Sequence, residues 1–326
     1  MNIIYMGTPE FAVKAFEAIV EAGHHVTACF TQPDKPKGRG KNMVPTPVKE
    51  KALAYDIPVY QPVKLREEEN EAIIRKLNPD VIVVAAYGQI LPERILNIPR
   101  LGCINIHASL LPKYRGAAPI EWAIIDGEKE TGVTTMYMAK GLDTGDMIEK
   151  CIVPIDEKET GVTLHDKLAD AGAKLIISTL KLLEAGTAVR TPQEDSLSCY
   201  ASMLTKDMGK LDFAKSAAEL ERLIRGLQPW PCAYTFINDK NVKVYEADVL
   251  ELNDDELKLI KPQLYLAAGD DVDIVPGMII RVTKKNFVVA CGENALVIKK
   301  LQPEGKKLMD TAAFLAGNRL EIGQVL

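Results

Sequence analysis

The chain has 326 residues, of which 47% are hydrophobic and 26% charged, and its formal net charge at pH 7 is −5. At about 150 residues per domain, this length predicts two domains, each large enough to bury its own hydrophobic core. The composition excludes a mainly disordered, collagen-like or coiled-coil protein, and the mildly acidic balance argues against a protein that coats nucleic acid indiscriminately.

Two further patterns bear on the cellular compartment. The longest apolar runs, such as residues 81–87, are much shorter than the roughly 20 residues that span a bilayer, and the chain does not begin with the basic and long apolar stretches of a signal peptide. The six cysteines are far apart and form no Cys-x-x-Cys pair, which is typical of free thiols in a reducing compartment. We therefore expect a cytoplasmic protein with no membrane partner.

The first half of the chain alternates short strand-like runs with amphipathic runs. The predicted strands cover residues 2–6, 26–31, 80–86, 102–108 and 132–138, and the predicted helices cover residues 11–22, 68–77 and 160–184. Residues 33–41 contain too many proline, glycine and charged residues for a helix or a strand, so we expect a long loop there. Because strands that alternate with helices form parallel sheets, the predicted fold class is α/β, with a doubly wound, mostly parallel, Rossmann-like sheet.

The second half has a different pattern. Residues 190–202 are polar and lack periodicity, and we interpret residues 190–205 as a linker between a domain of residues 1–189 and a domain of residues 206–326. One amphipathic helix is predicted at residues 214–225. Only short strand-like runs follow it, at residues 234–237, 242–249, 278–283, 286–291 and 295–301. Short strands separated by turns predict a smaller, OB-like β-barrel as the C-terminal domain.

One predicted strand carries candidate catalytic residues. Side chains alternate along a strand, so Cys103, Asn105 and His107 share one face of the strand at residues 102–108. In a doubly wound sheet the carboxyl ends of the strands border the ligand crevice, which residues 109–116 would then line. Asn105 and His107 can serve chemistry there or simply form hydrogen bonds within a tight strand end. This segment alone does not separate the two interpretations.

A second segment favours the chemical interpretation. The glycine-flanked turn Gly141-Leu142-Asp143-Thr144-Gly145-Asp146 follows the fifth predicted strand, and its Asp143 could reach the imidazole of His107. Asparagine can stabilise a developing oxyanion, histidine can donate or carry a proton, and aspartate can hold the histidine. Since this set contains no nucleophile of its own, the nucleophile would belong to the substrate, as when an amine attacks an activated carbonyl.

Three motifs resemble the signature of the folate-dependent formyltransferases. They are Asn105-x-His107, Ser109-Leu110-Leu111-Pro112-x-Tyr-Arg115-Gly116 and Leu142-Asp143-Thr144-Gly145. The resemblance implies an enzyme that uses 10-formyltetrahydrofolate as co-substrate. It implies that the catalytic residues are Asn105, His107 and Asp143. It also implies that the folate is contacted by Ser109, Leu110, Leu111 and Pro112.

Further motifs are similar, across almost the whole chain, to the branch of this family whose acceptor is initiator methionyl-tRNA. They lie at residues 7–12, 31–41, 116–120, 229–231 and 301–307. Gln228 departs from the pattern, because that branch commonly reads Asn-Pro-Trp-Pro where this chain reads Gln228-Pro229-Trp230-Pro231. The resemblance implies that residues 1–189 carry the transfer chemistry and that residues 206–326 help to bind tRNA.

A basic cluster lies in the predicted loop at residues 33–41. It consists of Lys35, Lys37, Arg39 and Lys41. By resemblance, these side chains engage the acceptor end of the tRNA, and clustered cations in an otherwise mildly acidic protein fit such local docking. The alternative is a solvated charged loop without a partner.

The other candidate residues give weaker evidence for a functional site. His24, His25 and His165 do not lie at metal-ligand spacing with cysteines or carboxylates, so we expect no metal. Cys103 could form a nucleophilic pair with His107, but a buried thiol farther from the strand end is the preferred interpretation. We expect a monomer with no DNA partner.

Two rival functions stay open. A formyltransferase that acts on an amino sugar nucleotide would share Asn105, His107 and Asp143. A non-catalytic RNA-binding protein with a degenerate fold would bind tRNA without turnover.

Overall fold

The computed structural model describes residues 1–37, 42–268 and 272–326. These residues divide into two compact units. The first contains Met1–Ile120, Lys129–Ile155 and Thr163–Ser202, and the second contains Glu121–Glu128, Asp156–Val162 and Met203–Leu326. Two short segments from the first half of the sequence therefore belong to the second unit, which no local sequence pattern indicated.

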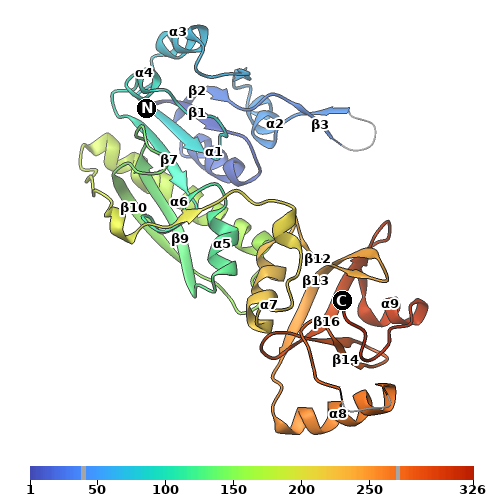
Figure 1. Cartoon of the computed structure of the whole chain (residues 1–326). Coiled ribbons are helices and arrows are strands. Elements are labelled where there is room, and N and C mark those ends of the chain that lie inside the picture. Colours follow the sequence, from blue (N-terminus) through green and yellow to red (C-terminus); the bar gives the residue numbers. More distant parts are fainter. Residues whose placement is uncertain (38–41, 269–271) are drawn as a thin grey trace. The chain divides into compact units, whose positions relative to one another are not determined.

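Within the described residues, the first unit contains a seven-stranded sheet with the strand order β10-β9-β7-β6-β1-β2-β5 (Figure 1). Its strands are β1 (Asn2–Gly7), β2 (His25–Phe30), β5 (Val59–Tyr60), β6 (Val81–Ala85), β7 (Cys103–His107), β9 (Glu130–Tyr137) and β10 (Met147–Pro154). Strands β7, β6, β1, β2 and β5 run parallel, whereas β9 and β10 run antiparallel to their neighbours. This confirms the predicted mostly parallel sheet. The edge strand β10 was missed because most of its residues are not buried and two of them are charged.

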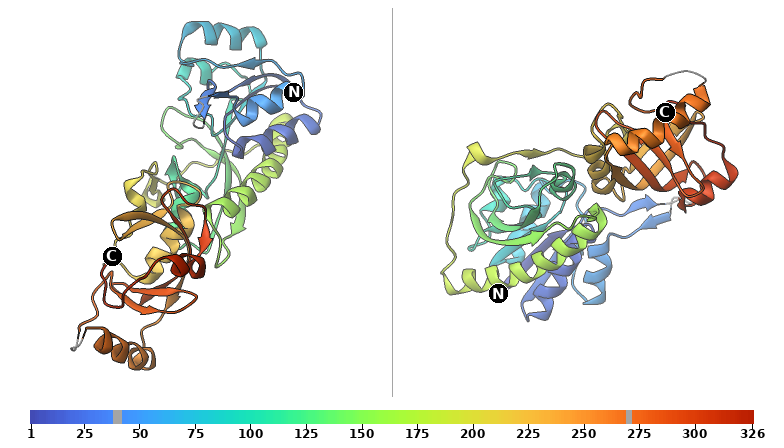
Figure 2. Two further views of the ribbon diagram at one scale, coloured as in Figure 1. Left: turned by 90° about the vertical axis from the view of Figure 1, so that its right-hand side faces the viewer. Right: turned by 90° about the horizontal axis from the view of Figure 1, so that it is seen from below.

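Helices cover both faces of this sheet. They are α1 (Phe11–Glu21), α2 (Pro47–Ala54), α3 (Glu68–Leu77), α4 (Glu93–Leu96) and α6 (Gly161–Ala185). Most of a further helix, α5 (Pro119–Ile125), belongs to the second unit. Helices α1 and α6 lie side by side along one face (Figure 2), where the Tyr5 and Phe16 rings are 5.3 Å apart. On the other face, Ile74 of α3 and Ile95 of α4 are buried with alternate residues of β1, β2, β6 and β7.

Part of the predicted loop at residues 33–41 is a strand. Residues of β3 (Lys35–Lys37) pair antiparallel with β4 (Asn42–Val44), so the prediction that this segment contains no strand was wrong. A two-stranded ribbon tolerates Pro36 because each strand has an unpaired edge where the missing N–H is not needed. Residues 38–41, which include Arg39 and Lys41, lie outside the described residues.

The second unit is built on an antiparallel sheet. Its strands are β12 (Ala233–Ile237), β13 (Lys240–Leu250), β14 (Ile279–Val282), β15 (Phe287–Ala290), β16 (Ala295–Pro303) and β17 (Met309–Asp310). The order is β12-β13-β16-β15-β14, with β17 on β16. Each of the five predicted C-terminal strands is present, with small differences at its ends. Strands β12 and β14 form the edges, and no pairing among the described residues joins them into a closed barrel.

Helices cover both faces of this second sheet as well. They are α7 (Ala217–Gly226), α8 (Asp254–Ala268) and α9 (Thr311–Gly317). Helix α7 begins with a capping box between Ser216 and Glu219. Helix α8 was not predicted, because Pro262 interrupts its pattern, yet Ile260 and Leu264 bury one face of it against β14, β15 and β16. None of the helices in the three described ranges is long and apolar enough to cross a membrane.

Short pieces of irregular backbone complete the two units. They are the paired strands β8 (Arg115–Gly116) and β11 (Tyr200–Ala201) and the 3-10 turns η1 (Asp195–Leu197) and η2 (Asp207–Gly209). Strands β8 and β11 run parallel to each other, separately from the seven-stranded sheet.

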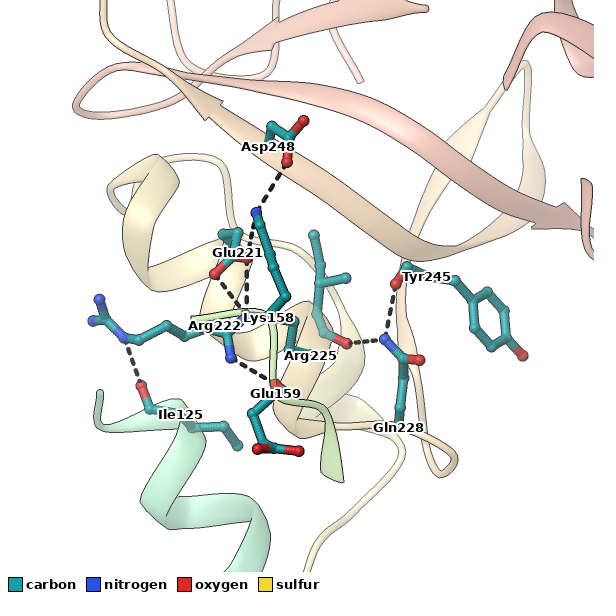
Figure 3. A network of polar contacts seen from close by, with 10 residues as sticks. Ile125, Lys158, Glu159, Glu221, Arg222, Arg225, Gln228, Tyr245 and Asp248 are labelled. Atoms are coloured by element: carbon teal, nitrogen blue, oxygen red, sulfur yellow. Dashed lines mark hydrogen bonds and ion pairs between the residues drawn. The ribbon is translucent and has the colours of Figure 1, made fainter. Parts of the chain in front are cut away.

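A polar network holds the two short segments within the second unit (Figure 3). The Nε of Arg222 donates to the carbonyl oxygen of Ile125 at 3.1 Å, and Nη1 of Arg225 donates to the carbonyl oxygen of Glu159 at 2.6 Å. Arg225 also pairs through Nε with the buried Glu221 carboxylate at 2.8 Å. Since the carbonyl oxygens at the end of α5 and at Glu159 receive charge-assisted hydrogen bonds, side chains of α7 fix the position of both segments.

Gln228 takes part in the same network (Figure 3). Its Nε2 donates to the carbonyl oxygens of Ile224 at 3.0 Å and Tyr245 at 2.8 Å. The residue that departs from the family motif therefore joins the end of α7 to β13.

Candidate functional site

Strand β7 places Asn105 and His107 at its carboxyl end. Cys103 is buried in the cluster that contains residues of α3 and α4. Ile106 points to α6 instead, because a Cβ added at Gly172 would lie 3.0 Å from its Cγ2. Since side chains alternate along a strand, Asn105 and His107 lie on the face of Cys103, as predicted.

The loop between β9 and β10 brings Asp143 to both of these side chains. The Nδ2 of Asn105 donates to Oδ1 of Asp143 at 3.5 Å, and Nδ1 of His107 lies 3.7 Å from Oδ2 of Asp143. Both distances are long for hydrogen bonds, as is common in sites whose contacts tighten only when substrate binds. The structure thus gathers the three predicted residues, although 38 positions separate Asn105 from Asp143.

The other ring nitrogen of His107 has a main-chain partner. Its Nε2 lies 2.9 Å from the carbonyl oxygen of Tyr114, and a carbonyl oxygen only accepts, so the contact assigns a proton to Nε2. The Nδ1 faces the Asp143 carboxylate. Both nitrogens of this buried ring therefore face protein groups. His107 can donate to a bound substrate only if it gives up its contact with one of these groups.

The backbone around Asp143 is closely constrained. Asp143 has a φ of 51°, in the left-handed region that aspartate adopts more readily than most residues. Its Oδ2 accepts a hydrogen bond of 2.9 Å from the N–H of Gly116. Two residues later, a Cβ at Gly145 would lie 1.8 Å from the carbonyl oxygen of Tyr137. The turn therefore requires glycine at position 145, and Asp143 is held in place by the fold as well as by its side-chain partners.

The segment predicted to contact folate is a compact turn after β7. Ser109 and Leu111 are fully buried, and the Ser109 hydroxyl donates to the Lys113 carbonyl oxygen at 2.6 Å. The Leu110 and Pro112 side chains are only partly buried. Apolar surface for a ligand is thus available at Leu110 and Pro112, whereas Ser109 and Leu111 shape the turn from inside.

The basic cluster begins on β3, which is anchored at its base by Asp34. The Asp34 carboxylate accepts hydrogen bonds from Nζ of Lys49 at 2.6 Å and from Nε2 of Gln61 at 2.7 Å. Lys35 is exposed, and Lys37 is the last residue of the strand. The hairpin that carries these lysines therefore starts from a fixed point on the first unit.

This anchor predicts a pH-dependent contribution to stability. The hydrogen bond from Lys49, then that from Gln61, lowers the pKa of the Asp34 carboxyl. A lowered pKa means that the stabilisation is complete above the unfolded-state pKa of about 3.9 and is lost as the pH falls through the folded-state value. Urea unfolding at pH 7 should show Asp34→Asn to be less stable than wild type, and the difference should shrink towards pH 3. A pH-independent difference would contradict this assignment.

Cys103 is not suited to nucleophilic chemistry. Burial raises the pKa of its thiol to about 12, so the thiolate is scarce at neutral pH. The interpretation of Cys103 as a buried thiol is confirmed. In the described part of the chain, no three His, Cys, Asp or Glu side chains are grouped so that they could hold a metal ion.

An open depression of about 750 Å³ lies at the amino end of β7. Its lining includes Arg100, Gly102 and Tyr137 but none of the three predicted catalytic residues. It therefore lies at the opposite end of the strand from Asn105 and His107.

Two further residues, Gln193 and Arg115, support the Asp143 loop, Gln193 directly and Arg115 through Gln193. Gln193 donates through Nε2 to the carbonyl oxygens of Asp143 at 2.7 Å and Gly145 at 2.8 Å. Arg115 donates through Nε to Oε1 of Gln193 at 2.9 Å. Arg115 belonged to a recognised motif, but Gln193 lies in a polar segment without periodicity, so no local signal could reveal its partner.

The chain matches two protein-family models, one in each half of the sequence. Residues 1–180 match the family model described as formyl transferase, and residues 203–319 match the model described as formyl transferase, C-terminal domain. A methionyl-tRNA formyltransferase of Lachnospira eligens is 52% identical over 328 residues, which cover 100% of this chain and 99% of the relative. The methionyl-tRNA formyltransferase of Clostridioides difficile is 48% identical over 326 residues, covering 100% of both chains.

A solved structure shares the fold at much lower identity. An N-formyltransferase from Helicobacter canadensis, in complex with folinic acid and dTDP-3-aminofucose, is 19% identical with a TM-score of 0.64, over 92% of this chain and 98% of that chain. With both family models matched and relatives similar over their full length, the chain belongs to the formyl transferase family.

Proposed function

We propose that this protein transfers the formyl group of 10-formyltetrahydrofolate to the free α-amino group of methionyl initiator tRNA. The observation that carries the proposal is the full-length similarity, at about half of all positions, to methionyl-tRNA formyltransferases. The cluster of Asn105, His107 and Asp143 supports it, because these groups can stabilise and move charge but supply no nucleophile.

The chemistry assigned to the cluster follows from its geometry. The folate supplies an activated formyl carbon, and a model α-amino group has a pKa of about 7.7–8.0, so an appreciable fraction of the attacking amine, roughly a tenth to a sixth, is neutral at pH 7. A new C–N bond forms as the bond from the formyl carbon to N10 breaks, and the proton lost by the amine passes to N10. We assign Asn105 Nδ2 to stabilising the developing oxyanion. His107 stabilises the oxyanion as well, once it gives up its contact with the Tyr114 carbonyl. Asp143 is assigned to orienting His107 and to the movement of the proton.

The turn at residues 109–112 fits a role in folate binding. Leu110 and Pro112 offer partly exposed apolar surface beside the cluster. Ser109 and Leu111, being buried, would act by fixing the turn. We therefore assign direct side-chain contacts with the folate to Leu110 and Pro112.

We assign tRNA binding to two parts of the chain. The basic side chains at 35–41 are proposed to bind the acceptor end, since phosphate contacts come mainly from lysine and arginine. The antiparallel sheet of residues 206–326 is proposed to act as an OB-like barrel that helps to hold the tRNA, with residues 1–189 carrying catalysis and 190–205 joining the two. A cytoplasmic monomer without a DNA or membrane partner fits this substrate.

Arg39→Ala tests the basic cluster. We expect the KM for methionyl-tRNA to rise several-fold at moderate salt. The slope of log KM against log salt concentration should fall by about 1, which corresponds to the loss of one phosphate contact. The KM for 10-formyltetrahydrofolate should not change. Lys181→Ala, which removes an exposed cation from α6, is the matched control. An unchanged KM for methionyl-tRNA in Arg39→Ala would refute the role.

Formyl transfer to three acceptors tests the function itself. The wild-type protein is incubated with 10-formyltetrahydrofolate and methionyl initiator tRNA, methionyl elongator tRNA or a dTDP-linked amino sugar. We expect the methionyl initiator tRNA to be formylated in preference to the elongator tRNA and the amino sugar. Formylation of the sugar alone would support the alternative, an amino sugar nucleotide formyltransferase, whereas tRNA binding without turnover would indicate a non-catalytic RNA-binding protein.

A further inference from the structure

Residues 190–201, which we call the strap, run across both loops that hold the catalytic cluster (Figure 1, yellow). At one end, Thr191 and Met147 exchange two backbone hydrogen bonds of 2.9 Å, beside the β9–β10 loop that carries Asp143. At the other end, Cys199 meets the loop after β7. Its carbonyl oxygen accepts from the N–H of Arg115 at 3.0 Å, and its Sγ accepts from the N–H of Tyr114 at 3.1 Å.

Gln193 lies between these two ends, and both polar atoms of its side chain form hydrogen bonds. Both N–H groups of its side chain donate to carbonyl oxygens of the catalytic loop, those of Asp143 and Gly145. Its Oε1 accepts from Arg115, whose Nη2 donates to Asp195 at 2.8 Å. One carboxamide thus links the strap, the Asp143 loop and the loop after β7.

The Gln193 side chain binds the main chain of Asp143 and so helps to set the position of that residue. Asp143 has a φ of 51°, and its carbonyl oxygen accepts a hydrogen bond of 2.7 Å from the Gln193 side chain. The same loop must bring the Asp143 carboxylate towards Asn105 and His107, at separations of 3.5 and 3.7 Å that leave room for adjustment. A displacement of about 1 Å at such a group can cost about 100-fold in rate.

We propose that Gln193 is a positioning residue for formyl transfer, which acts by holding the main chain of Asp143. The inference rests on the proposed function. The side-chain amide of Gln193 binds the main chain of the Asp143 loop, so its effect on Asn105 and His107 passes through Asp143. Changing Gln193 should therefore alter turnover and leave acceptor binding almost unchanged.

Single-turnover formyl transfer to methionyl initiator tRNA tests this role in three variants. Gln193→Ala removes the link, Gln193→Met keeps the bulk without hydrogen bonds, and Gln193→Glu keeps the shape while replacing both donors with an acceptor. We expect each to lower the rate by about 10- to 100-fold, with the KM for methionyl-tRNA within about two-fold of wild type. Glu194→Ala, which changes an adjacent exposed residue of the strap, should retain the wild-type rate.

A double-mutant cycle shows whether the effect passes through Asp143. In an Asp143→Ala background, Gln193→Ala should reduce the residual rate by less than about two-fold, because residues that act as a unit are not additive. A full additional loss in that background would overturn the proposal, as would a wild-type rate in Gln193→Glu. Thermal unfolding of every variant identifies one that fails to fold, in which case Gln193→Met and Gln193→Glu decide. If the wild type itself gives no formylmethionine, the proposed function has failed rather than this inference.

Discussion

His107→Ala is expected to lower the single-turnover rate of formyl transfer by about 10²–10³, because a preorganised donor to a developing oxyanion is typically worth that much. The same loss is expected for Asn105→Ala, whose amide lies beside Asp143 at the end of β7. The KM for methionyl-tRNA should change little, since neither side chain belongs to the basic cluster. Single-turnover kinetics with 10-formyltetrahydrofolate and charged initiator tRNA measure the effect.

The control for this prediction has to separate chemistry from folding. Removing the imidazole deletes its 2.9 Å hydrogen bond with the Tyr114 carbonyl, and losing a hydrogen bond of this kind costs about 0.5–1.5 kcal/mol. A modest fall in the midpoint of thermal unfolding is therefore expected in His107→Ala. His25→Ala, which removes an exposed imidazole from β2, should affect neither rate nor stability. Full single-turnover activity in folded His107→Ala would refute the catalytic assignment.

Gly145→Ala is expected to damage the same site through the backbone. The added Cβ would lie 1.8 Å from the carbonyl oxygen of Tyr137 and 3.4 Å from the N–H nitrogen of Ala139. Since the clash is with main chain, no side-chain rotation relieves it, and the loop must move. We expect a loss of about 3 kcal/mol in the free energy of unfolding and at least about 100-fold in rate, because Asp143 lies two residues away.

Gly141→Ala is the matched control in the same loop. Its Cβ would come within 2.4 Å of an atom, but that atom is the hydroxyl oxygen of Thr144, an exposed side chain that can rotate away. We expect less than about a five-fold change in rate, as for surface changes relieved by side-chain motion. Urea unfolding and single-turnover kinetics on both variants check the comparison. Equal losses at positions 141 and 145 would show that the approach to Tyr137 is not what constrains Asp143.

Local sequence patterns were sufficient where the determining interactions are themselves local. The alternation of Asn105 and His107 against Ile106 follows from strand geometry and matches the observed faces of β7. The capping box at Ser216 likewise lies where an amphipathic helix was expected to begin. Patterning was insufficient for α8, where Pro262 obscures the period although Ile260 and Leu264 are buried against the sheet.

The sequence by itself determined the α/β class, the two-part organisation of the chain and the three residues proposed for catalysis, because each depends on periodicity or on a short motif. Only the tertiary structure decided that Gln193 of a polar, unpatterned segment holds the Asp143 loop. The same is true of Glu121–Glu128 and Asp156–Val162, which belong to the second unit. Such contacts join positions far apart in the chain, and which distant positions meet is set by the packing of whole elements rather than by any local property of the residues involved.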